Sequence, residues 1–305
     1  MSYVSVIKGN DRRENVRQAL EALPASVWDK LKIARTVLIK PNLVHHQNQL
    51  ASTHVDAVRA VMDAVRARSQ ARIVVGDSSY HGTKPAFRNF GYENLPNEYE
   101  NVRLFDLNDD ETVPGYFMKR EGSKGEMGFS KTVAEADFTV CLTPMKTHRD
   151  VGVSLTTKNW TIGTWVPEAR IGLQGRYWPR WMYLHAEGPE AHNSTIAELL
   201  HQHRPDLAVL DAFLAMEGDG PTKGEPIKLD LALAGDDCVS VDRMACELMS
   251  IDPYDIGYLV MANQRGYGIM DKSRIELSGE TDLSSLKKEF KKPETWSKHV
   301  LAWKK

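Results

Sequence analysis

Cysteine is scarce in this sequence of 305 residues, which holds three cysteines and no C-x-x-C pair. Cys141, Cys238 and Cys246 are scattered along the chain, and two of them have apolar neighbours. We therefore expect neither an iron–sulfur cluster of the chain's own nor a structural zinc site made of cysteine. A disulfide framework is also not expected, and this favours a reducing compartment.

Long apolar runs and an excess of charge of one sign are missing as well. No stretch approaches the ~20 apolar residues of a membrane-spanning helix, and the opening MSYVSVIKGN has no signal-peptide core. The 39 basic and 41 acidic residues give a formal net charge of −2, so no overall field attracts nucleic acid or an anionic membrane. The composition predicts a soluble, cytoplasmic protein without a nucleic-acid or membrane partner.

The motifs of several common enzyme classes are absent. No G-x-G-x-x-G follows a predicted strand, so the NAD fingerprint is missing, and neither G-x-S-x-G nor H-E-x-x-H occurs. The glycine-rich stretch 216–226, MEGDGPTKGEP, is not a nucleotide-binding P-loop, because Glu225 and Pro226 follow its last glycine. The sequence thus specifies no cofactor, although it leaves open a divalent metal held by Glu217 or Asp219.

Short β-branched runs alternate with helical patterns along most of the chain. Strands are predicted at 3–9, 36–42, 71–79, 101–107, 137–144, 206–213 and 229–237, and helices at 15–23, 55–68 and 241–251. This order predicts an α/β fold with a mostly parallel or mixed sheet covered by helices, Rossmann-like without the dinucleotide fingerprint. We expect one domain over residues 1–270 and a C-terminal strand/helix extension over 271–305.

Residues 160–195 interrupt the alternation. They hold four of the seven tryptophans, interleaved with Arg170, Arg176 and Arg180. One interpretation is an insertion packed on the domain or a contact within a homo-oligomer. The other is a lid or wall that offers aromatic faces and guanidinium groups to an anionic ligand. His185 and His192 lie in the same segment and suit either metal ligands together with a carboxylate or loop histidines. Their spacing matches no metal-binding motif, which favours loop histidines.

Polar residues collect where the predicted strands end. In an open α/β sheet, ligands bind in the crevice beyond the carboxyl ends of the strands. Six strands are followed there by ionisable side chains, which predicts a site at this edge. The residues are Lys40 with Asn42; Asp77 with Ser78 and Ser79; Asp106; Lys146 with His148; Asp211; and Asp236 with Asp237.

The stretch 141–163, CLTPMKTHRDVGVSLTTKNWTIG, gives this site its predicted chemistry. Strand alternation places Lys146 and His148 on one face, and each lowers the proton affinity of the other, which suits acid–base work near neutral pH. Lys158 and Asn159 follow. The alternatives are a solvated lysine at Lys158 and a structural histidine at His148, just as Asp77, Ser78 and Ser79 suit either a helix cap or an anion cradle.

Taken together, the motifs resemble those of the family known as domain of unknown function 362. They are IKPNLV (39–44), VGDSS (75–79), PMKTHRDVGVSLTTKNWTIG (144–163), VLDAFLAMEGDGPTKGEP (209–226) and LAGDDCVSVDRMACELM (233–249). Many members carry a ferredoxin-like iron–sulfur segment, whose cysteines this sequence lacks. The resemblance places the following residues in the family's pattern: Lys40, Asn42, Asp77, Lys146, His148, Lys158, Asn159, Asp211, Glu217, Asp237 and Asp242.

The first hypothesis is an enzyme of small-molecule metabolism with a carboxylate or phosphate substrate. Its catalytic residues would be His148, Lys146 and Lys158, and the resemblance implies oxidation–reduction with a redox partner protein. A second hypothesis is a metal-dependent lyase, isomerase or hydrolase, and a third is a binding or assembly factor that uses the Trp/Arg segment. The predicted substrate-binding residues are Lys40, Asn42, Asp77, Ser78, Ser79, Asn159, Arg176, Asp211 and Asp237.

Overall fold

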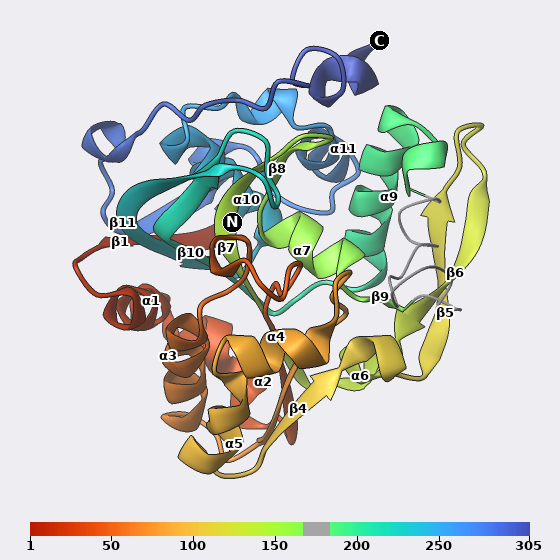
Figure 1. Cartoon of the computed structure of the whole chain (residues 1–305). Coiled ribbons are helices and arrows are strands. Elements are labelled where there is room, and N and C mark those ends of the chain that lie inside the picture. The colour runs from red at the N-terminus through yellow and green to blue at the C-terminus, as the bar shows by residue number, and fades with distance from the viewer. Residues whose placement is uncertain (167–183) are drawn as a thin grey trace.

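A mixed sheet forms the centre of the protein, whose computed structural model describes residues 1–166 and 184–305 (Figure 1). In the described part the strand order is β12-β1-β11-β10-β7-β2-β3-β4, with β8 paired to β7. The strands are β1 (Ser2–Lys8), β2 (Thr36–Lys40), β3 (Arg72–Asp77), β4 (Val102–Asp106), β7 (Phe138–His148), β8 (Gly152–Ser154), β10 (Leu207–Glu217), β11 (Glu225–Gly235) and β12 (Ile275–Gly279).

Five neighbouring strands, from β10 to β4, run parallel to one another. The central β11 is antiparallel to both of its neighbours, and β12 is parallel to β1. The predicted α/β fold with a mostly parallel or mixed sheet is therefore confirmed. Because the parallel strands share a direction, the polar residues that follow β2, β3 and β7 reach the same edge of the sheet.

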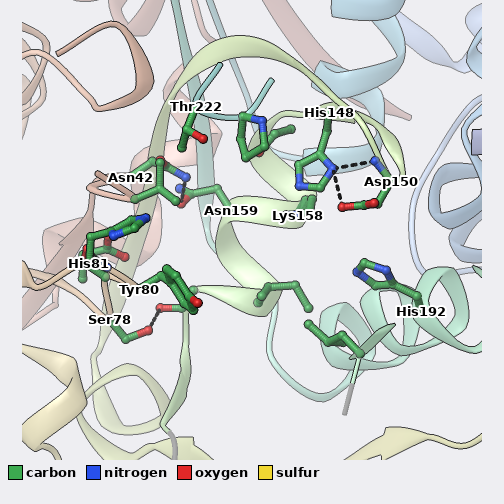
Figure 2. Close-up of a pocket in the computed structure, with 18 of the residues that line it drawn as sticks. Asn42, Ser78, Tyr80, His81, His148, Asp150, Lys158, Asn159, His192 and Thr222 are labelled. Carbon is green, nitrogen blue, oxygen red and sulfur yellow. Dashed lines mark hydrogen bonds and ion pairs between the residues drawn. The ribbon is translucent and has the colours of Figure 1, made fainter. Parts of the chain in front are cut away.

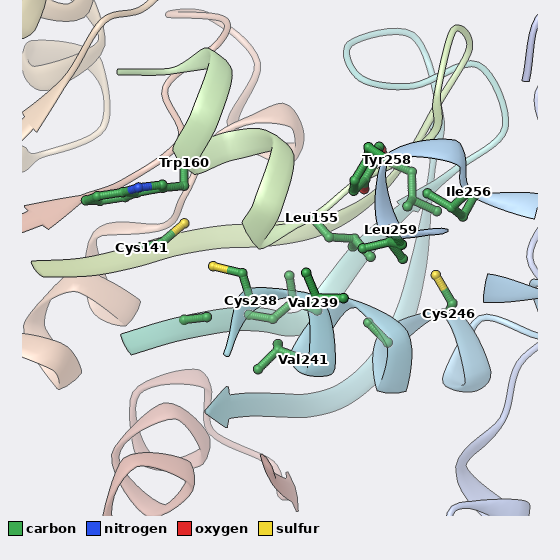
Figure 3. Packing of buried hydrophobic residues seen from close by; sticks show 14 of the residues in the cluster. Cys141, Leu155, Trp160, Cys238, Val239, Val241, Cys246, Ile256, Tyr258 and Leu259 are labelled. Carbon is green, nitrogen blue, oxygen red and sulfur yellow. The ribbon is translucent and has the colours of Figure 1, made fainter. Parts of the chain in front are cut away.

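Helices cover both faces of the sheet, as the alternation of side chains along the strands requires. In β2, Val37 and Ile39 join the hydrophobic cluster under α1 and α3, whereas Leu38 joins the cluster under α7, α9, α10 and α11. Figure 3 shows part of the second cluster, with Trp160 of α7, Cys238 of α10 and Leu259 of α11. The helices are α1 (Arg12–Glu21), α2 (Asp29–Lys32), α3 (Val55–Arg66), α4 (Thr83–Asn89), α5 (Leu95–Glu98), α6 (Lys131–Glu135), α7 (Thr156–Ile162), α9 (Pro189–Gln202), α10 (Cys238–Leu248) and α11 (Gly257–Gln264).

A second, three-stranded sheet lies beside α9 (Figure 1). Its strands are β5 (Thr112–Met118), β6 (Lys124–Ser130) and β9 (Trp165–Val166), all antiparallel. The amide of Gln202 in α9 bonds both backbone groups of Tyr116 in β5, which fixes the sheet to the helix. The sequence patterns did not predict this sheet, because β5 and β6 are interrupted by Pro114 and three glycines.

The predicted insertion at 160–195 is partly regular structure. Its first residues complete α7 and form β9, and its last ones begin α9. Arg170, Arg176 and Arg180 lie outside the described residues, as do two of its four tryptophans.

The C-terminal extension is bound firmly to the domain. Its strand β12 pairs with β1 at the edge of the main sheet. Beyond it, Trp296 and Val300 are buried against Gly152, at the start of β8. Among the described helices, none has the length and apolar character needed to cross a membrane.

Candidate functional site

A cavity of about 290 Å³ lies beyond the carboxyl ends of β2, β3 and β7 (Figure 2). This is the edge at which the strand-end residues predicted a site. The segments after β2 and β3 form one side, α7 forms the floor, and α9 with the end of β7 forms the other side. Its polar lining residues include Asn42, Asp77, Ser78, Ser79, Tyr80, His81, His148, Asp150, Ser154, Lys158, Asn159, His185, His192 and Thr222.

Lys40 is fully buried behind the cavity and holds three elements together. Its Nζ donates to Asp77 Oδ1 at 2.6 Å, to Asn159 Oδ1 at 2.9 Å and to the Pro41 carbonyl at 3.0 Å. Asp77 Oδ2 accepts the backbone N–H of Leu43 at 2.7 Å. Because an ammonium has three N–H donors, these partners use all of them. Lys40 therefore orients β2, β3 and α7 and does not itself line the cavity.

Lys146 is also fully buried, one layer behind the cavity surface. Its Nζ donates to Asn42 Oδ1 at 3.0 Å and to the Ala51 carbonyl at 2.7 Å. The Asn42 amide in turn donates to Asn159 Oδ1 at 3.0 Å. Burial lowers the pKa of Lys146 to about 7, and the charge of Lys158 contributes to the lowering. The lysine fixes the orientation of Asn42, which does line the cavity.

Lys158 lines the cavity from α7, a helix whose position depends on a buried carboxylate. Asp242 Oδ1 accepts the N–H of Thr156 at 2.8 Å, and Oδ2 accepts that of Thr157 at 2.9 Å. These are the first N–H groups of α7, which have no partner inside the helix. Burial raises the pKa of Asp242 to about 6. Asp242 thus acts on the site by capping the helix that carries Lys158.

The serines after β3 bind backbone groups. Ser78 Oγ donates to the Gly163 carbonyl at 2.7 Å, and Ser79 Oγ donates to the Leu43 carbonyl at 2.5 Å. Their hydroxyl protons are therefore used to hold the cavity wall in shape, although both residues line it.

Two histidines with buried rings form the wall opposite Asn42 (Figure 2). His148 Nδ1 accepts the backbone N–H of Asp150 at 3.1 Å. Burial lowers the pKa of His148 well below 6.5, and the nearby charge of Lys158 lowers it further. The ring is therefore neutral at pH 7, and since Nδ1 is an acceptor, its proton lies on Nε2.

His192, on α9, has a buried Nε2 without a hydrogen-bond partner among the described residues. Its ring packs edge-to-face on His185, with 5.2 Å between centroids, and burial lowers its pKa well below 6.5. A buried nitrogen without a partner beside a cavity is a group that a ligand can satisfy. The sequence interpretation of a loop histidine is wrong here, because the apolar spacing of α9 is weak and gave no signal of a helix.

Asp150 lies among three imidazoles at the rim of the cavity. Its carboxylate oxygens are 3.8 Å from His148 Nδ1, 3.9 Å from His185 Nε2 and 3.7 Å from His299 Nδ1. His299 belongs to the C-terminal extension, so this segment reaches a residue that lines the cavity. Sequence analysis did not single out Asp150 or His299.

Two predicted substrate-binding residues lie away from the cavity. Asp211 pairs with Arg12, whose Nε is 3.0 Å from its Oδ2, on the α1 side of the sheet. Asp237 is the N-cap of α10 and accepts the N–H of Ser240 at 3.0 Å. Asp237 follows its strand, as predicted, but β11 runs antiparallel to β10 and ends at the opposite edge of the sheet. Asp211 lies within β10, which continues to Glu217, so it does not mark a strand end.

The candidate metal ligands bind the C-terminal extension. Glu217 Oε2 accepts the N–H of Lys291 at 2.9 Å, and Asp219 Oδ1 accepts that of Glu294 at 3.0 Å. Within residues 1–166 and 184–305, no group of three or more His, Cys, Asp or Glu side chains is placed to hold a metal ion. Arg176 falls outside these ranges.

Comparison with known proteins agrees with the fold. The solved structure of the lactate racemase apoprotein from Thermoanaerobacterium thermosaccharolyticum superposes with a TM-score of 0.50 at 17% identity, over 80% of this chain and 56% of that chain. A thylakoid-associated protein of Synechocystis sp. is 25% identical over 260 residues, which cover 84% of this chain and 74% of the relative. A family model matches residues 37–247, and the chain therefore belongs to the family described as domain of unknown function (DUF362).

Proposed function

We propose that this protein is an enzyme that binds a small anionic metabolite, a carboxylate or phosphate, and transfers a proton on it. The observation that carries the proposal is the meeting, in one cavity, of the cation Lys158 with two neutral, buried imidazoles, His148 and His192. A cavity of about 290 Å³ suits a small metabolite.

Charge supports an anion at the α7 end of the cavity. Lys158 lines it there, with Lys146 in the layer behind. The buried carboxylate of Asp77 is paired with Lys40 at 2.6 Å. Asp150 lies at the other end, beside the histidines. A carboxylate or phosphate group of the substrate would therefore bind at Lys158 and Asn42, with its reacting carbon toward the histidines.

The two histidines have different hydrogen-bonding states, which suits two roles. His148 carries its proton on Nε2 and is placed to donate to a substrate oxygen on which negative charge develops. His192 has an unpartnered Nε2 that can accept a proton when the ring's other nitrogen carries the hydrogen. Such a pair serves proton abstraction next to a carboxylate, as in isomerisation, racemisation or elimination. The similarity in fold to a lactate racemase supports this class.

Other parts of the function remain proposals from the sequence. Oxidation–reduction with a partner protein, which the family resemblance implies, would need an electron carrier bound from outside. Metal-dependent chemistry and a role as an assembly factor are the alternatives, and a cytoplasmic location is the expected one.

The test begins with binding. Small 2-hydroxy and 2-oxo carboxylates and phosphorylated three-carbon acids are titrated into the wild type, Lys158→Gln and the control Lys8→Gln, which changes an exposed lysine in β1. We expect Lys158→Gln to weaken anion binding by about 10- to 100-fold, the loss of one charged hydrogen bond, and Lys8→Gln to leave it unchanged. Equal binding by all three proteins would contradict the placement of the anion.

Proton transfer is then followed by ¹H NMR in D₂O as loss of the substrate's C–H signal next to the carboxylate. His148→Gln and His192→Gln should each slow this exchange by about 100-fold or more while binding changes little. An anion that binds at Lys158 but exchanges equally fast in both variants would refute the catalytic roles and leave a binding protein.

A further inference from the structure

A second hollow lies at the opposite edge of the sheet, where β2 and β3 begin. It is an open groove between the end of α2, the end of α3 and the loop that enters β3. Because β2 and β3 run from this groove toward the cavity, the two hollows lie at opposite poles of the parallel strands. The cavity and the groove share no lining residue.

The groove is strongly basic. Of its eleven lining residues, all within the described ranges, five are cations and none is a carboxylate. The cations are Lys32, Arg35, Arg66, Arg68 and Arg72. The nearest acids give weak competition: Arg35 is 90% exposed with Asp137 at 4.0 Å, and Lys32 pairs at 2.7 Å with Asp29, whose side chain is 66% exposed.

Two of the five arginine and lysine side chains are held in place by the fold. Arg66 donates to the carbonyls of Ala71 and Glu100, both at 2.6 Å. Arg68 stacks over Trp28, with its Cζ 4.3 Å from the ring centroid, and donates to the Ala64 carbonyl. These contacts neutralise no charge, because every partner is a carbonyl or a ring. The groove therefore presents a partly rigid set of positive charges, of which Lys32 and Arg35 have an acidic neighbour at its exposed rim.

An exposed aliphatic side chain lies close to two of these cations in the sequence. Ile33 follows Lys32 directly at the end of α2 and is 84% exposed, the largest exposed fraction among the large hydrophobic residues of the described chain. One exposed isoleucine alone is ordinary. Beside a basic groove it matches the pattern of peripheral membrane proteins, in which cations bind lipid headgroups and an apolar side chain enters the acyl boundary.

We propose that this groove docks the protein on an anionic lipid surface, with Ile33 inserted and the cations of the groove against the headgroups. Nucleic acid phosphates would bind the cations as well, but they would make no favourable contact with an exposed isoleucine. With the groove on the lipid, the opposite pole faces away from the membrane, so the cavity stays accessible. The formal net charge of −2 is no obstacle, since headgroup attraction acts within a Debye length of the surface.

The test is co-sedimentation of the full chain with phosphatidylcholine vesicles, with and without phosphatidylglycerol. The wild type should bind only the anionic vesicles, less strongly as salt is raised. Removing two charges by Arg35→Gln/Arg72→Gln should weaken binding by about 25-fold, which is fivefold per charge, and Ile33→Ser should weaken it about tenfold. The matched control Lys288→Gln/Lys298→Gln removes two exposed charges from the basic C-terminal segment and should change binding less than threefold.

Circular dichroism of each variant verifies folding, and all four substituted positions of the double variants are exposed. Three results would overturn the proposal. The first is a wild type that does not distinguish the two kinds of vesicle. The second is an equal loss in the groove variant and in the control, which would show an effect of net charge only. The third is binding that is indifferent to Ile33→Ser and is displaced by single-stranded RNA, which would assign the groove to nucleic acid.

Discussion

Replacing the buried Lys146 by methionine should change how the stability of the protein depends on pH. The lysine is fully buried, and its pKa is about 7 in the folded protein against about 10.5 when exposed. Methionine has a similar length and carries no charge. The substitution removes the hydrogen bonds to Asn42 Oδ1 and the Ala51 carbonyl at every pH, but it removes the penalty for burying a charge only where the lysine is protonated.

The sign follows from which state binds more protons. Below pH 7 the ammonium is present in the folded and the unfolded chain, so the burial penalty is complete. Between pH 7 and pH 10.5 the unfolded chain binds the extra proton, and the stability of the wild type rises with pH. A difference of about 3.5 pKa units corresponds to a total of about 5 kcal/mol. Between pH 6 and pH 9 the stability of the wild type should rise by about 2–3 kcal/mol of this total.

Urea denaturation of wild type and Lys146→Met at pH 6, 7.5 and 9 measures this effect. Subtracting the unfolding free energies of the two proteins at each pH removes the contribution of the other titrating groups. Lys8→Met serves as a control for the loss of an exposed lysine. We expect the variant to be closest to the wild type in stability at pH 6 and to fall behind by about 2–3 kcal/mol at pH 9. A difference that is constant across this range would refute the argument that Lys146 titrates near neutrality in the folded state.

Two further substitutions test the layer behind the cavity. Lys40→Met leaves the buried Asp77 carboxylate without its cation and should cost about 3–5 kcal/mol of unfolding free energy, measured by urea denaturation. The double variant Lys40→Met/Asp77→Asn should recover part of this loss, and no recovery would contradict the buried ion pair. Gly163→Ala would place a Cβ onto Lys40 Nζ and the Asn159 carbonyl, so it should lower the melting temperature and weaken anion binding together. Gly122→Ala meets no neighbour and carries only the strain of an alanine at φ +82°, so it should leave anion binding unchanged; anion binding that is equally unchanged in Gly163→Ala would argue against a crowded Gly163.

The sequence alone determined the strands at the centre of the main sheet and several of the helices that cover it, but not the second sheet. Each predicted strand and helix is recovered within a few residues, because apolar periodicity is a local property that reflects which face of an element is buried. The edge of the sheet that carries the cavity was predictable for a related reason. In parallel strands all carboxyl ends meet, so Asn42, Asp77 and His148 had to come together.

The tertiary structure decided which of those polar residues face a ligand. Lys40 and Lys146, like His148, lie at or near the carboxyl end of a parallel strand. Asp77 binds the ammonium group of Lys40 and the Ala51 carbonyl binds that of Lys146, so both groups point into the interior. Asp211 lies within β10 and pairs with Arg12, and Asp237 caps the start of α10, so neither carboxylate reaches the cavity. Partners that lie far apart in the sequence, such as Arg12 and Asp211, leave no mark on local periodicity.

Two features became visible only through contacts between distant segments. His192 reaches the cavity because α9 packs on α7 and α11, and His299 reaches Asp150 because the C-terminal extension folds back over β8. The basic groove is similar, since a net charge of −2 is a sum over the chain and does not show where cations gather. Sequence determined what each segment is, and the packing of segments against one another decided what each polar group meets.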